Sequence, residues 1–524
     1  MADSLASADR QIARATAVVM LGMALSSLAG LAATILVSRA FGASAELDAF
    51  YAANRISEML FNLMAGGALA SAFVPTFTGL LTQGERERAW RLASSIANLV
   101  FLALLTLAGL AWVAAPWLVE NVLAPGFRDA EQIHLTVSLL RTLLISALIF
   151  GQSGLLMGVL NAQGHFALPA LAPAAYRLGW ILGATLLAPK MGISGLAWGV
   201  VLGSLLHLLV QLPALRGRNA RYQASMNLGD PSVRLVGKLI APRFLGVAVV
   251  QLNFLVNTIL ASGQPEGSLS AISIAFQVMI MPQAVIAQAA AIAALPTFSA
   301  QAARGDMSGI RASLVNTLRA VFFLAFPATI GLILLRQPIV MLLLQRGAFD
   351  QRATGLVAWA LLWYAVGLVG HSLLEIVARA FYALKDTRTP VLVGAGAMGA
   401  NVLLSLSFSW YFPQVGWAPH GGLALANSTA TALECCILLI LLRRKLGGLD
   451  EPGLRRGILA TVLAGGVLAV VTWGWLAARP TPSLGLLVLG GVTLGAGAYW
   501  LAAWAFGAPE ARQLPAAWFR RSPG

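Results

Sequence analysis

Long apolar stretches separated by short polar gaps run through the whole chain of 524 residues. Each stretch is long enough to cross the hydrocarbon core of a bilayer as an α-helix, and no strand-like alternation is present, which excludes a β-barrel. The pattern predicts an all-α polytopic membrane protein with about 14 transmembrane helices, at residues 15–40, 46–79, 91–118, 133–160, 168–188, 192–215, 236–262, 269–298, 311–344, 354–383, 389–412, 421–443, 456–478 and 483–507.

The apolar pattern is duplicated. Pro75-Thr76-Phe77 recurs as Pro296-Thr297-Phe298, and the shift in residue number from Pro75 to Pro296, the repeat offset, also pairs further positions along the chain. Past an insertion of about six residues, Gly195-Leu196-Ala197 pairs with Gly422-Leu423-Ala424. One nearly constant offset is the mark of an internal repeat, and two similar halves of a membrane chain usually enclose a substrate path. The other paired positions are Gly84 with Gly305, Phe101 with Phe322, Gly126 with Gly347, Ala162 with Ala383, Pro169 with Pro390, and Leu215-Arg216 with Leu442-Arg443.

The repeat predicts four parts. Residues 1–217 form an N-terminal lobe of six helices, 218–235 a cytoplasmic linker, 236–446 a C-terminal lobe of six helices, and 447–524 two further helices and a tail. Both halves start on the same side of the membrane, so they are predicted to be parallel repeats. Prolines within or at the ends of helices are candidate kinks, at Pro116, Pro242, Pro282, Pro296 and Pro327.

Composition and charge support this class. Hydrophobic residues make up 58% of the chain, charged residues 10%, and the mean hydropathy is +0.79. Lys and Arg gather in every second gap between helices, which by the positive-inside rule places both termini in the cytoplasm. The net charge of +15 is therefore assigned to orientation and anionic lipid headgroups, and no nucleic-acid partner is expected. The adjacent Cys435 and Cys436 predict no disulfide or metal site.

Polar residues at membrane depth are the candidates for function, since a charge at the bilayer centre costs on the order of 3 kcal/mol. Arg55, Glu58 and Asn62 share one helix face, either as a packed ion pair or as a polar stripe that contacts an anionic substrate. Arg177 is the other cation that lies deep in the membrane in this half. Further candidates for the substrate-binding set are Gln251, Asn257 and Gln277, whose amides join helices or face water. Asp48 belongs to the same predicted set.

A second polar face holds His371, Glu375 and Arg379, for which structural pairing and a proton or cation relay both stay open. The five histidines are scattered and no hydrolase or zinc motif is present, so no enzyme activity and no cofactor are expected. A nucleotide-binding motif is also absent.

Several short motifs are spread over nearly the whole chain. They are Phe41-Gly42-Ala43-Ser44, Asp48-Ala49-Phe50-Tyr51, Gly67-Ala68-Leu69, Ala72 to Phe77, Ala124-Pro125-Gly126-Phe127, Leu160-Asn161, Pro169 to Pro173, and Phe381 to Pro390. Together these motifs resemble the MurJ/MviN family. The resemblance implies the fold of the multidrug/oligosaccharidyl-lipid/polysaccharide exporter superfamily. It also implies a flippase that carries lipid II to the outer leaflet by alternating access, driven by an ion gradient or the membrane potential. The last two helices would form a groove for the lipid tail.

The same resemblance implies cavity arginines that meet the substrate's diphosphate, and this chain departs from it there. The matching positions hold Ser27, Ala33, Phe61 and Gln277. Asp48 and the basic Arg55 do match the family pattern, and Arg55 and Arg177 are the cations left to meet a diphosphate. Near the sodium site that the resemblance implies stand Asn401 and Thr429 or Thr431, without a carboxylate on the neighbouring helix.

The leading hypothesis is a lipid II-like, undecaprenyl-diphosphate-linked precursor flippase of the bacterial inner membrane. It would be a monomer among membrane lipids, coupled to Na+ or H+. The alternatives are a flippase for another polyprenyl-linked glycan, a small-molecule or cation antiporter of the same superfamily, and a transport-inactive membrane scaffold.

Overall fold

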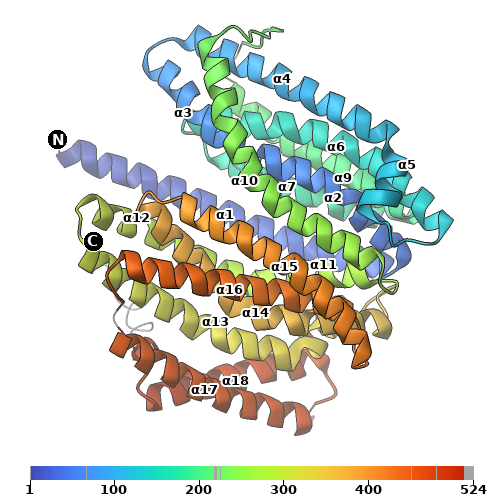
Figure 1. The fold of residues 1–524 in the computed structure, drawn as a ribbon, viewed down its shortest axis with the longest axis vertical. Helices are drawn as coiled ribbons and strands as arrows, with labels where there is room; N and C mark the ends of the chain where they lie inside the picture. The colour runs from blue at the N-terminus through green and yellow to red at the C-terminus, as the bar shows by residue number, and fades with distance from the viewer. Residues whose placement is uncertain are drawn as a thin grey trace. The chain divides into compact units, whose positions relative to one another are not determined.

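The computed structural model describes residues 2–65, 68–216, 221–224, 226–449, 451–478 and 481–512. Within these ranges the chain is helical, with short turns and no strand (Figure 1). The α-helices are α1 Ala2–Phe41, α2 Ala45–Ala65, α3 Ala68–Thr82, α4 Arg86–Val113, α5 Ala115–Leu118, α6 Ala130–Ala162, α7 Ala167–Leu182, α8 Ala188–Met191, α9 Ile193–Leu209, α10 Pro231–Ser262, α11 Ser268–Gln283, α12 Ala289–Ala303, α13 Met307–Leu344, α14 Gln351–Ala383, α15 Arg388–Gln414, α16 His420–Lys445, α17 Glu451–Ala478 and α18 Leu484–Ala505. Shorter π or 3₁₀ segments are Val119–Leu123, Gly183–Leu187, Leu212–Leu215 and Ala284–Gln288.

The all-α membrane class is confirmed. In the described ranges, 12 helices are long and apolar enough to cross a membrane. Every predicted span falls on helix, but two of the predicted spans are not among the 12. Residues 46–79 divide into α2 and α3, and residues 236–262 lie in α10, which begins at Pro231. The count of 14 therefore stays a prediction.

The chain divides by its contacts into two compact units. The first comprises Met1–Ser270 with Arg346–Phe349, and the second comprises Ala271–Gln345 with Asp350–Gly524. In the first unit α2 packs on α6, α1 on α7, and α7 and α6 on α9. In the second unit α14 packs on α13 and α16, α15 on α16, and α17 and α18 on each other and on α13. The four parts predicted from the repeat are defined by sequence duplication, whereas these two units are defined by contacts. The four parts therefore stay a prediction.

Each unit has an apolar interior. In the first, Phe73 and Phe77 stack with ring centroids 5.1 Å apart, and Trp90 meets Phe77 edge-on. In the second, Phe323 packs against Tyr499 and Trp500, which attaches α18 to α13. Side chains that face lipid in a membrane protein stay apolar, so these buried aromatic contacts rather than hydrophobicity alone locate the packing faces.

Glycines bring α7 and α9 into backbone contact. A Cβ added at Gly179 of α7 would lie 2.2 Å from the Cα of Gly203 of α9, closer than real Cβ contacts. The side chains of larger residues would separate the two helices, as expected from the small residues at membrane helix interfaces. The close approach holds α7 in place, and α7 carries Arg177.

The duplication is visible in the turns. At the C-terminal end of α3 the Glu85 amide donates to Leu80 O and Gly84 has φ +80°. After α12 the Asp306 amide donates to Gln301 O and Gly305 has φ +70°. Each of these three positions is related to its counterpart by the repeat offset. Such hydrogen bonds around a left-handed residue form the Schellman ending of a helix.

The start of a later helix is duplicated in the same register. Asp129 caps α6 by accepting from the Gln132 amide at 3.3 Å, and Asp350 caps α14 by accepting from the Ala353 amide at 2.7 Å. An Asp side chain at this position satisfies amides that the first helical turn leaves unpaired. The repeat thus preserves the local chemistry that begins and ends its helices.

A π-helical turn separates α11 from α12. It covers Ala284–Gln288, follows Pro282 and precedes α12. A proline removes one helical hydrogen bond, so a local π turn near it is expected.

Candidate functional site

An ion pair lies on the inner face of α2. Arg55 Nη1 donates to Glu58 Oε2 at 2.9 Å, and Asn54 Nδ2 donates to Glu58 Oε1 at 2.9 Å. Arg55 Nε donates to Thr258 Oγ1 on α10 at 3.0 Å. The expected pairing of Arg55 with Glu58 is confirmed. Both carboxylate oxygens therefore have donors, and the pair is tied to a second helix of the same unit.

A pocket of about 160 Å³ opens beside this pair. Its polar lining comes from α2 and α7, and Phe150 on α6 adds an apolar wall. Glu58 lies about 20 Å along α2 and Arg177 about 15 Å along α7, so both stand several turns from the residue at which their helix begins. The lining residues are Ser57, Glu58, Asn62, Phe150, Tyr176, Arg177 and Trp180.

Arg177 is the distinctive charge of this pocket. Its guanidinium lies over the rings of Tyr176 and Trp180, at 5.7 and 5.6 Å from their centroids. In the described part of the chain no carboxylate lies within ion-pair distance of it, whereas Arg55 is neutralised by Glu58. Cation–π contact stabilises a guanidinium but does not neutralise its positive charge. The pocket therefore presents a positive charge that an anion can neutralise.

The charges of the pocket belong to one repeat only. By the repeat offset, Arg55 corresponds to Phe276, Glu58 to Met279 and Arg177 to Met398. The duplicated frame accordingly folds with apolar residues at all three positions. The three charges are thus not a requirement of the helix packing itself, which favours a role in binding.

The other predicted substrate-binding residues are partly gathered here. Asn62 Nδ2 donates to Gln251 Oε1 on α10 at 3.4 Å, which joins two of them next to the pocket. Asn257 Nδ2 donates to Asn253 Oδ1 at 3.3 Å along α10. Gln277 is half-buried on α11 in the second unit.

Asp48 lies at the opposite end of α2 from Asn62. Its buried carboxylate accepts from the backbone amides of Gly267 and Ser270, each at 2.7 Å, and from the Ser270 hydroxyl at 2.6 Å. These donors stand at the first turn of α11, where a carboxylate is favourable. Asp48 caps the start of α11, and it does not line the pocket.

The predicted ion-coupling residues lie in the second unit. Glu375 and Arg379 pair along α14 at 3.7 Å, both half-buried. Asn401 accepts from the Ser405 hydroxyl on α15, and the Thr429 hydroxyl donates to Leu425 O on α16. Within the described ranges no group of three or more His, Cys, Asp or Glu side chains is placed to hold a metal ion.

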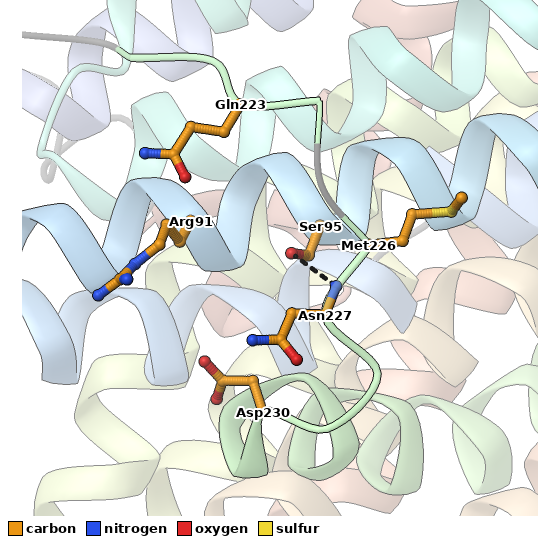
Figure 2. A pocket seen from close by; sticks show the side chains of 6 residues that line it. All are labelled: Arg91, Ser95, Gln223, Met226, Asn227 and Asp230. Atoms are coloured by element: carbon orange, nitrogen blue, oxygen red, sulfur yellow. Dashed lines mark hydrogen bonds between the residues drawn. The ribbon is translucent and has the colours of Figure 1, made fainter.

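Two further pockets belong to the first unit. One, of about 350 Å³, lies where the connection before α10 crosses α4 (Figure 2). There the Gln223 amide donates to Ser94 Oγ at 3.1 Å and the Asn227 amide to Ser95 Oγ at 3.5 Å. Arg91 and Asp230 extend from α4 and from the start of α10 at the two ends of this pocket.

The third pocket is a mostly apolar groove of about 410 Å³ between α1, α6 and α7. Ser27, one of the positions that would carry a family arginine, lines this groove, and its hydroxyl donates to Met23 O. Ala33 is buried, and the side chain of Phe61 is outside the described residues. Neither described position offers a substitute cation, which leaves Arg55 and Arg177 for that role.

Sequence reasoning missed the aromatic walls Phe150, Tyr176 and Trp180 and the buried Ser57. Tyr176 and Trp180 stand one and three residues from Arg177 in sequence, so the spacing of aromatic residues around a membrane arginine was an available signal. Phe150 and Ser57 come from other helices, and no local pattern marks them.

The fold and the pocket define a multi-pass α-helical membrane protein of the transporter type, built on an internal repeat. A family model described as "Lipid II flippase MurJ" matches residues 37–492. The chain belongs to this MurJ family, and its relatives indicate a protein of the bacterial inner membrane.

Similar proteins support the assignment. "Lipid II flippase MurJ" of Burkholderia cenocepacia is 33% identical over 470 residues, which cover 87% of this chain and 90% of that protein. "Probable lipid II flippase MurJ" of Vibrio cholerae is 31% identical and covers 79% of each chain.

Solved structures show the same fold. A lipid II flippase MurJ in an inward closed conformation matches with a TM-score of 0.80 at 24% identity, covering 95% of this chain and 99% of that one. An inward-facing multidrug resistance MATE family transporter matches with a TM-score of 0.68 at 18% identity, covering 80% and 94%. The resemblance to the MurJ family is confirmed.

Proposed function

We propose that this protein is a flippase that moves lipid II from the cytoplasmic to the outer leaflet of the inner membrane. Family membership and the names of the relatives support the substrate. The activity needs translocation and no bond-making chemistry, so no catalytic residue is assigned.

The observation that carries the proposal is Arg177 in its pocket. A lipid-linked diphosphate is a dianion, and guanidinium groups bind phosphate oxygens by paired, charge-assisted hydrogen bonds. Arg177 has no carboxylate partner in the described chain, and Arg55 lies on the neighbouring helix. A volume of about 160 Å³ is smaller than that of ordinary ligand sites, so the pocket accommodates the charged group and not the whole glycolipid.

The remaining assignments belong to the same proposal. The two repeats alternate access to the substrate, both termini face the cytoplasm, and the protein acts as a monomer. Asn62, Gln251, Asn257 and Gln277 supply amide contacts to the headgroup. Transport is coupled to an ion gradient or the membrane potential, with Glu375, Arg379, Asn401 and Thr429 as the candidate coupling residues.

The test is rescue of a bacterium depleted of its own lipid II flippase, together with lipid II translocation in proteoliposomes. We expect R177A to lower translocation by about tenfold or more, since a hydrogen bond to a charged group is worth roughly 1.5–3 kcal/mol. R177K keeps the charge without the guanidinium fork, so its rate should lie between those of R177A and the unmodified protein. K190A removes an exposed cation from the outer end of the same span and should leave translocation unchanged.

Three other results would contradict the proposal. If R177A rescues growth and translocates as well as the unmodified protein, this pocket does not bind the headgroup. If the unmodified protein fails to rescue but exports a drug from vesicles, it is an antiporter of the superfamily. If it transports nothing and co-purifies with a stable partner, it is a scaffold.

A further inference from the structure

Glu58 shares its pocket with the cation that would bind an anion. Its side chain is 37% exposed, against 15% for that of Arg55, so the carboxylate is the more accessible member of the pair. Glu58 and Arg177 line the same pocket, and both act electrostatically on Tyr176. An anion that reaches Arg177 therefore also meets a carboxylate.

The charges of the neighbourhood can be listed helix by helix. On α2 the groups near Glu58 are Arg55 and Tyr51, and on α7 they are Arg177 and Tyr176. The helix α6 contributes the neutral Phe150, and α10 contributes the neutral Thr258 through Arg55. His207 on α9 bonds to Ser153 of α6 instead. Among these described groups, two guanidinium charges face one carboxylate.

The net charge of Arg55, Arg177 and an ionised Glu58 does not neutralise a bound dianion. With Glu58 ionised, the two arginines and the carboxylate carry a net charge of +1, and a bound diphosphate diester brings the total to −1. With Glu58 protonated, the total is zero. Unbalanced charge in a poorly solvated site is costly, so anion binding favours the protonated carboxyl.

We infer that Glu58 takes up one proton when an anionic diphosphate headgroup binds beside Arg177, so that headgroup and proton are bound together. The proton comes from water and adds to a carboxylate oxygen of Glu58. Arg55 then exchanges its ion pair with Glu58 for one with the phosphate oxygens. The inference rests on the proposed function and names its proton-linked group.

Linkage makes the inference measurable. If one proton binds with each anion, the dissociation constant falls as the pH is lowered, by at most tenfold per pH unit. A diphosphate diester has no group of its own that titrates near neutral pH, so the dependence reports on the protein. The repeat supports this role, because Met279 at the equivalent of Glu58 shows that the fold does not need a carboxylate there.

The experiment measures lipid II binding to the full-length protein in nanodiscs of zwitterionic lipid at pH 6 and pH 8, with proton uptake followed by an indicator dye. We expect a dissociation constant at least about fivefold lower at pH 6, because binding that takes up a proton strengthens as the proton concentration rises. E58Q should bind at pH 8 as tightly as the unmodified protein does at pH 6, without pH dependence. E58D should keep the dependence, and the exposed E87Q should match the unmodified protein.

Two probes identify what the pocket recognises. Inorganic diphosphate should compete with lipid II at pH 6, where it is mainly a dianion. A neutral polyprenol should not compete, and strong competition by it would overturn the inference, since the pocket would then recognise the tail.

The failures are distinguishable. If the unmodified protein binds no lipid II at either pH, the proposed function itself is wrong. If it binds lipid II equally at both pH values and takes up no proton, the proton link is wrong while the function stands. Should E58Q fail to elute as a folded protein, the proton uptake of the unmodified protein decides the question alone.

Discussion

Among the described residues, Lys385 is the one non-glycine residue with a positive φ, at +59°. The repeat explains it. Its counterpart in the first half, at the repeat offset, is Gly164 with φ +73°, and the same helix-ending hydrogen bonds surround both residues. Lysine thus occupies a left-handed position that the fold retains from the repeat, at a cost of about 1 kcal/mol relative to glycine.

We expect Lys385→Gly to stabilise the protein by about 1 kcal/mol, since the lysine side chain is exposed and the left-handed backbone suits glycine. Gly164→Ala should destabilise it by a similar amount, because no atom lies within 4 Å of the added Cβ and only the backbone strain counts. Thermal unfolding in detergent measures both. Equal unfolding midpoints for K385G and the unmodified protein would show that the left-handed backbone of Lys385 is not strained.

At the scale of helices, a carboxylate in the turn between α14 and α15 joins three of them. Asp386 accepts from the Thr389 amide at 3.1 Å and from its hydroxyl at 2.9 Å, and Lys445 at the end of α16 donates to it at 2.6 Å. The Lys445 ammonium, with these Thr389 donors, lowers the pKa of Asp386 to about 2. This turn is part of the motif Phe381 to Pro390, so its sequence has a structural reason.

The consequence is a pH dependence. A carboxyl whose pKa is lower in the folded state contributes stability above its unfolded pKa, and that contribution is lost as the pH falls from about 4 to 2. We expect Asp386→Ala to cost about 1 kcal/mol or less at pH 7, because the Lys445 side chain is 40% exposed and solvent screens the pair. The difference from the unmodified protein should shrink steadily below pH 4, as measured by unfolding at stepped pH. A difference that is constant down to pH 2 would show that the ion pair is not the cause.

Over the whole molecule, the charge pattern predicts an orientation. Turns with Lys or Arg in them or directly beside them follow α3, α12, α14 and α16. The opposite turns follow α1, α10, α13 and α15. With helices that each cross once, these two groups of turns face opposite sides of the membrane.

Single cysteines placed in a variant that lacks Cys435 and Cys436 test the orientation. A cysteine at Gln83 or Thr387 should react with an impermeant maleimide only in inside-out vesicles. One at Ser44 or Gln414 should react only in right-side-out cells. Labelling of both groups from one side would disprove the topology with cytoplasmic termini.

Local patterns predicted much of this protein. Apolar length located the helices, and i, i+3 and i, i+4 spacing predicted that Arg55 pairs with Glu58 and Glu375 with Arg379, as the structure confirms. Adjacent cysteines on a helix point apart, and Cys435 is buried while Cys436 is exposed.

The sequence by itself determined the class, the repeat and the family, because hydrophobic length, recurring turns and motif spacing are properties of neighbouring residues. Only the tertiary structure decided which polar groups meet. It places Arg177 of α7 in one pocket with Glu58 of α2, and it assigns Asp48 to a helix start. Such meetings depend on how close the helices pack, which in a membrane is set by glycines and side-chain shape rather than by the hydrophobic pattern.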